Sequence, residues 1–185
     1  GGTQAGSLRF YNNGTHWPRS MVATAELNRT FGIESELGFC DMGGEFVAWL
    51  RNDAGAASVA LKGGQVLSWH PSGHEEVLWV SDVRPKSPDQ ALRGGVPVCW
   101  PWFGPHPVDA ALPNHGFVRT RLWTVAGSAS NTQSTELTLK TETAPADFSL
   151  WPHAAEVSLR IIAGATLRLE LTTRNTGSKA FELTQ

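Results

Sequence analysis

Residues 166–172 are Thr-Leu-Arg-Leu-Glu-Leu-Thr, with leucine at every odd position and a polar residue at every even one. Successive side chains of a β-strand point to opposite faces of a sheet, so this alternation predicts a strand with one buried face. The same alternation occurs at residues 136–140 and 156–161, and the turn-forming residues 163–165 separate the last two segments. The three segments together predict an antiparallel meander.

Upstream of the meander, the sequence predicts further short strands and one helix. Glycine-containing turn sequences at residues 52–55, 62–64 and 71–73 separate short apolar segments. The expected elements are strands at residues 46–50, 57–61, 65–69 and 77–80 and a helix at residues 23–31 that ends at Gly32. Many short strands with a single helix favour an all-β fold, a large antiparallel β-sandwich, over alternating β and α units.

The composition is that of one globular domain with no signal for a charged partner. The chain has 185 residues, of which 41% are hydrophobic and 17% charged, and its formal net charge is -2. This charge gives no footprint for nucleic acid or for an anionic membrane. The apolar runs are far shorter than the roughly 20 residues that span a bilayer, and a signal peptide is not evident. We therefore predict a cytoplasmic protein without nucleic-acid or membrane partners, and we expect it to be a monomer.

Cofactor and metal chemistry find no support in the sequence. Cys40 and Cys99 are the only cysteines, too few for a disulfide framework or a structural zinc site, and we interpret them as reduced structural thiols. The histidines show no metal-ligand spacing. Motifs of the serine-hydrolase, phosphate-loop, dinucleotide-binding and zinc-protease types are absent from the sequence. We expect no cofactor and no metal.

The two ends of the chain differ from its middle. Residues 1–20 begin with a polar, glycine-rich stretch and are expected to form a disordered or tag-derived leader. Residues 181–185 stop within a strand-like alternation, and a sandwich that ended there would leave an unpaired edge. We therefore expect residues 21–185 to be the N-terminal portion of a single β-sandwich domain, truncated at its C-terminus.

Residues 93–105 are the first candidate for a binding site. Their sequence, Arg-Gly-Gly-Val-Pro-Val-Cys-Trp-Pro-Trp-Phe-Gly-Pro, combines one cation, three large aromatic residues and six glycines or prolines. Such a composition predicts a rigid, irregular loop. Arg93 is a candidate for binding a phosphate or carboxylate, the alternative being a surface salt bridge. Trp100, Trp102 and Phe103 are candidates for a sugar platform, although aromatic side chains commonly lie in cores and at least one of the three is expected there.

A second candidate segment, residues 112–119, is Leu-Pro-Asn-His-Gly-Phe-Val-Arg. Asn114, His115 and Arg119 supply an amide, an imidazole and a second cation. If a strand begins at His115, residues 115, 117 and 119 share one face. His115 is suited either to proton transfer or to a structural hydrogen bond. Together with Arg93, these side chains predict a clamp for an anion and for hydroxyl groups.

Residues 91–105, followed by residues 112–119 and Trp123, resemble the hexose-6-phosphate mutarotases, or glucose-6-phosphate 1-epimerases, of the aldose 1-epimerase superfamily. The resemblance covers most of the chain in one order, and its further segments are residues 27–33, 62–69, 78–81, 175–177 and 181–185. It implies the large antiparallel β-sandwich of the galactose mutarotase type. It also implies interconversion of the α and β anomers of a hexose 6-phosphate by acid-base ring opening, without a cofactor.

The resemblance also assigns roles to individual residues. Substrate contacts of the family fall at Arg93, Asn114 and Arg119, to which the chemistry of the segments adds His115 and Trp102 as substrate-binding candidates. The position of Asn114 is often glutamine in the family, so a shorter hydrogen-bond reach is implied here.

The family's proton-transferring residues do not fall within residues 1–185. The acid histidine belongs to an Ala-Leu-His-x-Tyr-Phe motif that is expected immediately after Gln185, and the base glutamate lies further on. We therefore expect the 185-residue chain alone to bind sugar phosphate weakly and to be inactive. Two alternatives remain: a non-catalytic carbohydrate-binding module, which would not need two converging arginines, and an epimerase of neutral aldoses, in which they would have no anion to hold.

Overall fold

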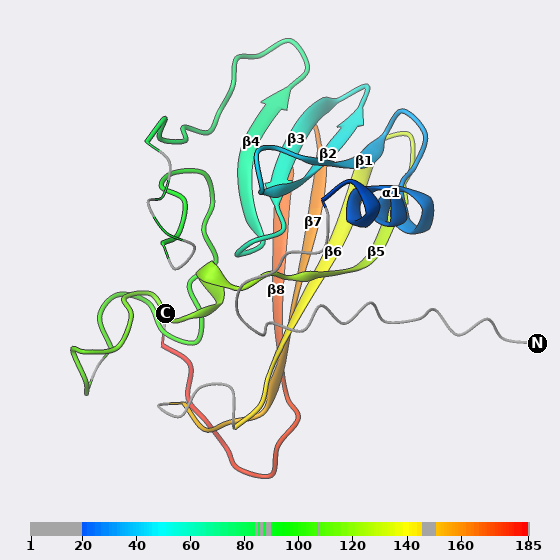
Figure 1. Ribbon diagram of the computed structural model, residues 1–185. Coiled ribbons are helices and arrows are strands. Elements are labelled where there is room, and N and C mark those ends of the chain that lie inside the picture. The colour runs from blue at the N-terminus through cyan, green and yellow to red at the C-terminus, as the bar shows by residue number, and fades with distance from the viewer. Residues whose placement is uncertain are drawn as a thin grey trace, which may run out of the picture.

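The computed structural model describes residues 20–83, 85, 87, 90–106, 108–145 and 151–184. These residues form two four-stranded antiparallel sheets that pack face to face, with a single α-helix beside them (Figure 1). The predicted leader, residues 1–20, lies outside the described residues apart from Ser20, the first residue of the helix. At 12 residues, the helix is too short to cross a membrane.

Both sheets follow the order of the chain, because each strand is hydrogen-bonded to the next one in sequence. The first sheet consists of β1 (Leu37–Asp41), β2 (Phe46–Asn52), β3 (Gly55–Ala60) and β4 (Gln65–Pro71). The second consists of β5 (Thr124–Ser130), β6 (Ser134–Thr143), β7 (Ala155–Gly164) and β8 (Leu167–Asn175). The helix α1 (Ser20–Phe31) packs beside β1 and β5.

The strands predicted from clear alternation are confirmed, as β2, β3, β4, β6, β7 and β8, and so is the helix. The predicted strand at residues 77–80 is wrong, since only a single bridge between Val80 and Gly94 forms there. Two strands were not predicted. In β1, the alternation is interrupted by Gly38, where a β-carbon would collide with the ring of Trp49 on the neighbouring strand. In β5, a bulge near Val125 shifts the register and breaks the period of two.

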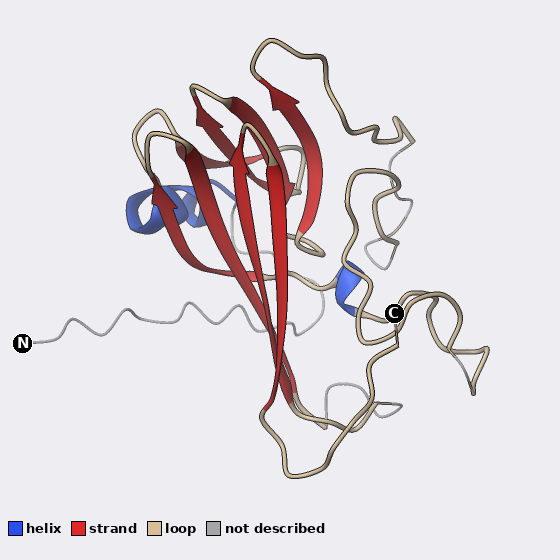
Figure 2. Cartoon of the chain, turned by 180° about the vertical axis from the view of Figure 1, so that it is seen from behind, coloured by secondary structure: helices blue, strands red, loops and turns tan. Residues whose placement is uncertain are grey.

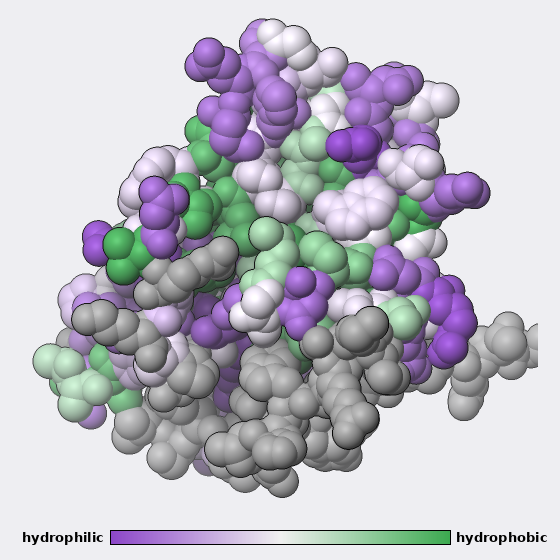
Figure 3. All heavy atoms as spheres, turned by 45° about the horizontal axis from the view of Figure 1, so that its top comes forward, coloured by the Kyte–Doolittle hydropathy of each residue, from purple (hydrophilic) through white to green (hydrophobic). Residues whose placement is uncertain are grey.

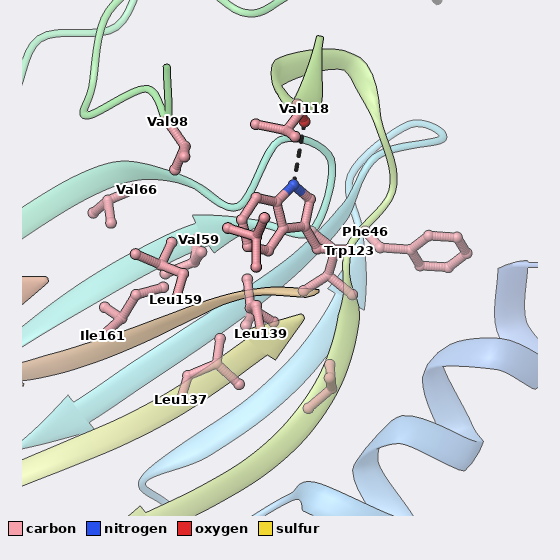
Figure 4. Close-up of a cluster of buried hydrophobic side chains, with 14 of the residues drawn as sticks. Phe46, Val59, Val66, Val98, Val118, Trp123, Leu137, Leu139, Leu159 and Ile161 are labelled. Carbon is pink, nitrogen blue, oxygen red and sulfur yellow. Dashed lines mark hydrogen bonds between the residues drawn. The ribbon is translucent and has the colours of Figure 1, made fainter. Parts of the chain in front are cut away.

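The core lies between the two sheets and is closed at one end by Trp123. Leucine, isoleucine and valine side chains from β6 and β7 meet those of β3 and β4 around the indole ring (Figure 4). Trp123 is 1% exposed, and its Nε1 donates a hydrogen bond to the carbonyl oxygen of Val118 at 3.2 Å. The edge strand β8 is less covered: Leu167 and Leu169 are partly buried, whereas Leu171 is exposed.

Residues 118–123 link the candidate loops to the first sheet. They contain the short 3₁₀ helix η1 (Val118–Thr120). The amide of Trp123 donates to the carbonyl of Leu61 at 2.9 Å, and the amide of Gly63 donates to that of Arg121 at 2.7 Å. Figure 2 shows the described parts of the long connection between β4 and β5 beside the two sheets, as loops and the short helix η1. The sandwich thus provides a fixed base for both candidate segments.

Candidate functional site

The two glycines after Arg93 are required by the close packing of three backbone segments. Gly94 and Gly95 have φ angles of 99° and 60°, in the left-handed region that glycine adopts without strain. A β-carbon on either residue would overlap a carbonyl oxygen, that of Trp79 for Gly94 and that of Val66 for Gly95. The Gly-Gly pair therefore allows the loop to lie against β4 and residues 79–81. The side chain of Arg93 is exposed at this bend.

The second candidate segment is bonded to the far end of the first. The amide of His115 donates to the carbonyl of Gly104 at 2.7 Å, and the amide of Phe117 donates to that of Trp100 at 3.1 Å. The indole Nε1 of Trp102 donates to the carbonyl of Pro113 at 2.9 Å. Residues 100–104 and 113–117 therefore form one backbone unit.

The predicted strand beginning at His115 is wrong. His115 and Gly116 have φ angles of 66° and 72°, and the chain then enters the 3₁₀ helix η1. A β-carbon at Gly116 would overlap the carbonyl oxygen of Trp100, so the backbone turns where two segments meet. Residues 115, 117 and 119 consequently do not share a strand face.

His115 has a structural hydrogen bond, one of its two predicted roles. Its Nδ1 accepts a hydrogen bond from the amide of Gly104 at 3.0 Å. This bond assigns the proton of the neutral ring to Nε2, because an accepting ring nitrogen carries no proton. The ring also packs edge-on against Phe103, with 4.9 Å between centroids. Nε2 is therefore the atom with a proton to donate to a ligand.

Neither candidate arginine is neutralised by a described carboxylate. Ion pairs in the described part of the chain involve other cations and leave Arg93 and Arg119 without an acidic partner. The Nε atom of Arg119 is buried and has no hydrogen-bond partner in the described structure. A buried cationic donor of this kind favours an anionic ligand. The salt bridge considered as the alternative for Arg93 is not found among the described residues.

Arg119 is close enough to Cys99 to affect its ionisation. Burial raises the pKa of the Cys99 thiol, and the positive charge of Arg119 partly opposes that rise. Both cysteines are free thiols, as predicted. No hydrogen bond, ion pair or ring contact joins Arg93 to Arg119 or His115 in the described part of the chain. Arg93 lies at the β4 end of the loop, Asn114 and His115 lie beside its other end, and the backbone of Arg119 lies against Gly63, just before β4.

The exposed aromatic residue of the loop is Phe103. Trp100 and Trp102 are each 3% exposed, whereas Phe103 is 62% exposed. Trp102 packs against His106 and Phe117, with centroid distances of 4.6 and 5.9 Å. The expectation that at least one of the three aromatic residues belongs to the core is confirmed. A substrate contact by Trp102 stays a prediction, and in this structure its ring supports the loop from inside.

The C-terminal end of the described chain lies against the same loop. The amide of Phe103 donates to the carbonyl of Thr184 at 3.1 Å, and the amide of Thr184 donates to that of Pro101 at 3.2 Å. Phe181 holds this segment in place by packing on Trp151, with 4.9 Å between ring centroids. In Figure 1 the C-terminus accordingly lies among the loops. This pairing was not predictable from the local sequence of residues 181–185.

Two surface hollows of the described structure lie away from the candidate segments. One is lined by residues including Trp49, Arg51 and Ala56, and the other by the two turns at residues 51–55 and 70–73. Hydrophilic side chains gather over the upper part of the view in Figure 3, which brings this end of the sheet forward. Candidate site residues line neither hollow. Clusters of three or more metal-binding side chains are not found among the described residues.

The arrangement of the sheets identifies the class of fold as that of the sugar mutarotases. A crystal structure of a "putative mutarotase" from Salmonella typhimurium matches with a TM-score of 0.72 and 35% identity, over 78% of this chain and 48% of that one. Galactose 1-epimerase from Lactobacillus acidophilus matches with a TM-score of 0.55 at 14% identity, which shows the fold alone. The predicted all-β sandwich of the galactose mutarotase type is confirmed.

Residues 47–185 match the family described as aldose 1-epimerase, and the chain belongs to this family. It is 43% identical over 115 residues to a "Putative glucose-6-phosphate 1-epimerase" of Salmonella typhimurium, covering 62% of this chain and 39% of the relative. A relative of the same name from Cenchrus ciliaris is 35% identical over 137 residues, covering 69% and 41%. The chain thus spans about two fifths of the length of these relatives, and the family resemblance is confirmed.

Proposed function

We propose that the whole protein containing this chain interconverts the α and β anomers of a hexose 6-phosphate. The observation that carries the proposal is the pair of arginines without carboxylate partners, of which Arg119 has a buried, unbonded Nε. Arginine in such a setting binds phosphate strongly, because the guanidinium group offers several donors in one plane. Membership of the aldose 1-epimerase family and the names of the relatives support a phosphorylated sugar as the ligand.

In this proposal the two segments divide the recognition of the substrate. Arg93 and Arg119 bind the phosphate, and the amide of Asn114 bonds a sugar hydroxyl. His115 donates its Nε2 proton to another oxygen of the sugar, which leaves its Nδ1 bond to Gly104 intact. Trp102 supports the second segment through the hydrogen bond from its indole Nε1 to the carbonyl of Pro113. These roles require no metal and no cofactor. We also propose that the protein is a cytoplasmic monomer and does not bind nucleic acid.

We propose further that the proton-transferring histidine and glutamate follow Gln185 in the whole protein. The pairing of Thr184 with Pro101 and Phe103 supports this, because it brings the last described residue of the chain next to Phe103, whose ring packs against His115. Ring opening then combines an acid and a base from the later part of the protein with the phosphate contacts of this part. The 185-residue chain alone is proposed to bind the sugar phosphate weakly and not to catalyse.

The test is exchange spectroscopy by NMR on the anomers of glucose 6-phosphate, with the full-length protein and with Arg93→Ala. The matched control is Arg168→Ala, because Arg168 is an exposed arginine on β8 whose guanidinium pairs with Glu170. We expect faster anomer exchange with the full-length protein, a strong loss in Arg93→Ala and no change in the control. Lack of any acceleration would overturn the proposal. Equal acceleration of unphosphorylated glucose would instead favour the epimerase of neutral aldoses, and sugar binding without acceleration the carbohydrate-binding module.

A further inference from the structure

Two buried polar side chains lie where β4 begins, next to the loop that carries Arg93. Gln65, the first residue of β4, is 2% exposed, and Lys62 in the preceding turn is 7% exposed. Burying such groups is unfavourable unless they are hydrogen-bonded, so their partners indicate what they stabilise.

Their hydrogen-bond partners are alternate carbonyl groups of the segment that contains Arg93, and Lys62 also forms an ion pair with Glu45 at 3.8 Å. The side-chain amide of Gln65 donates to the carbonyl of Gly94 at 2.6 Å and to that of Leu92 at 3.3 Å. These are the two residues that flank Arg93. The ammonium group of Lys62 donates to the carbonyl of Gln90 at 3.2 Å, two residues further upstream.

The backbone of Arg93 is held from the opposite side as well. Its carbonyl accepts a hydrogen bond from the amide of Ser81 at 2.9 Å, and the amide of Gly95 donates to Trp79 at 2.7 Å. The Arg93 side chain is exposed, and it forms no ion pair with a described residue. The main chain at Arg93 is therefore fixed while its guanidinium group stays available.

We propose that Gln65 is a positioning residue for Arg93, and this inference rests on the proposed function. The amide nitrogen of glutamine carries two protons, one for each of the flanking carbonyls. By fixing residues 92–94 before the substrate arrives, Gln65 reduces the ordering that phosphate binding would otherwise require. A glutamate at this position would present only acceptors to the two carbonyls, and a methionine would fill the same space without bonding them.

The inference is tested by a double-mutant cycle on the full-length protein, with KM and kcat for glucose 6-phosphate as the readout. Gln65→Met is expected to raise KM about tenfold, as for loss of one hydrogen-bond equivalent, with little change in kcat. In an Arg93→Ala background the same substitution is expected to raise KM no further, because Gln65 acts through Arg93. If Gln65 affected KM only through the general stability of the fold, Gln65→Met would raise KM to the same extent in the Arg93→Ala background.

Asn52→Leu is the matched control, because the amide of Asn52 also donates to a backbone carbonyl, that of Ala163 in the other sheet. It should lower stability and leave KM unchanged. If Gln65→Met does not fold, Gln65→Asn keeps the amide, shortens its reach and should raise KM in the same way. If Arg93→Ala raises KM but the Gln65 variant does not, the inference is refuted while the proposed function stands. The same holds if the effects of the two substitutions on KM multiply independently in the double variant. An unchanged KM in Arg93→Ala would refute the phosphate role of Arg93 and the inference with it.

Discussion

Replacing Gly63 by alanine tests whether the site depends on the close approach of two backbones. Gly63 has a φ angle of 75°, and a β-carbon there would lie 2.5 Å from the carbonyl oxygen of Arg119. Real β-carbons keep at least 3.0 Å, so the two backbones would have to separate. Gly73 is the control, because its φ angle is 77° and a β-carbon there would meet nothing within 4 Å.

Both substitutions place an alanine in the left-handed region, but only Gly63→Ala also forces two backbones apart. An alanine in the left-handed region costs roughly 1 kcal/mol at either position. At Gly63, the forced separation also weakens the hydrogen bond from its own amide to the carbonyl of Arg121, now 2.7 Å long. A lost backbone bond with a buried group left unpaired costs about 1–3 kcal/mol more. We therefore expect Gly63→Ala to lower the free energy of unfolding by about 2–4 kcal/mol and Gly73→Ala by about 1 kcal/mol.

Urea unfolding of the two variants of the full-length protein measures this difference directly. Because the separation moves the backbone of Arg119, Gly63→Ala should also weaken inhibition of anomer exchange by inorganic phosphate, whereas Gly73→Ala should not. Equal losses of stability in the two variants would show that the contact between Gly63 and Arg119 is not tight. Normal phosphate inhibition in a destabilised Gly63→Ala would show that Arg119 is not part of the phosphate site.

Three further substitutions probe the loop, the thiol and the core. Phe103→Ala should raise KM for a hexose 6-phosphate about threefold to tenfold and leave inhibition by inorganic phosphate unchanged. The reason is that the exposed phenyl ring of Phe103 can pack on a sugar ring but not on inorganic phosphate. Equal effects on both ligands would contradict this. Arg119→Ala removes the charge that lowers the pKa of the Cys99 thiol, so alkylation of Cys99 at pH 8, followed by mass spectrometry, should slow relative to Cys40. An unchanged ratio of the two rates would argue against the proximity. Trp123→Ala should lower the free energy of unfolding in urea by about 3–5 kcal/mol, and a loss below about 1 kcal/mol would mean that the core repacks.

Strands with regular alternation were predictable because one buried face imposes a period of two. In β8 the alternating leucines predicted the strand. They did not predict that Leu171 is exposed, because its exposure depends on the position of β8 at the edge of the sheet. The strand β1 was not predictable, because Gly38 leaves room for Trp49, a residue of another strand. A bulge hid β5 in the same way, by changing register where the side chains are small.

For the candidate site, the composition predicted an irregular loop at residues 93–105, but it did not predict the backbone course of residues 115–119. Arg93, followed by two glycines, was recognised as an anion-binding candidate in an irregular loop. The positive φ angle of His115 was not foreseen, because a histidine before a glycine fits a strand start equally well. Gln65 gave no local signal at all, since its partners at residues 92 and 94 become neighbours only in the folded chain.

The pairing of Thr184 with Pro101 and Phe103 has a consequence for biosynthesis. A nascent chain that has emerged only as far as β8 already contains both arginines and every glycine of the two segments. Its loop nevertheless lacks the hydrogen bonds that close it on the side of Phe103. The two hydrogen bonds that join residues 101 and 103 to Thr184 can therefore form only after residue 184 has been synthesised and has left the ribosome.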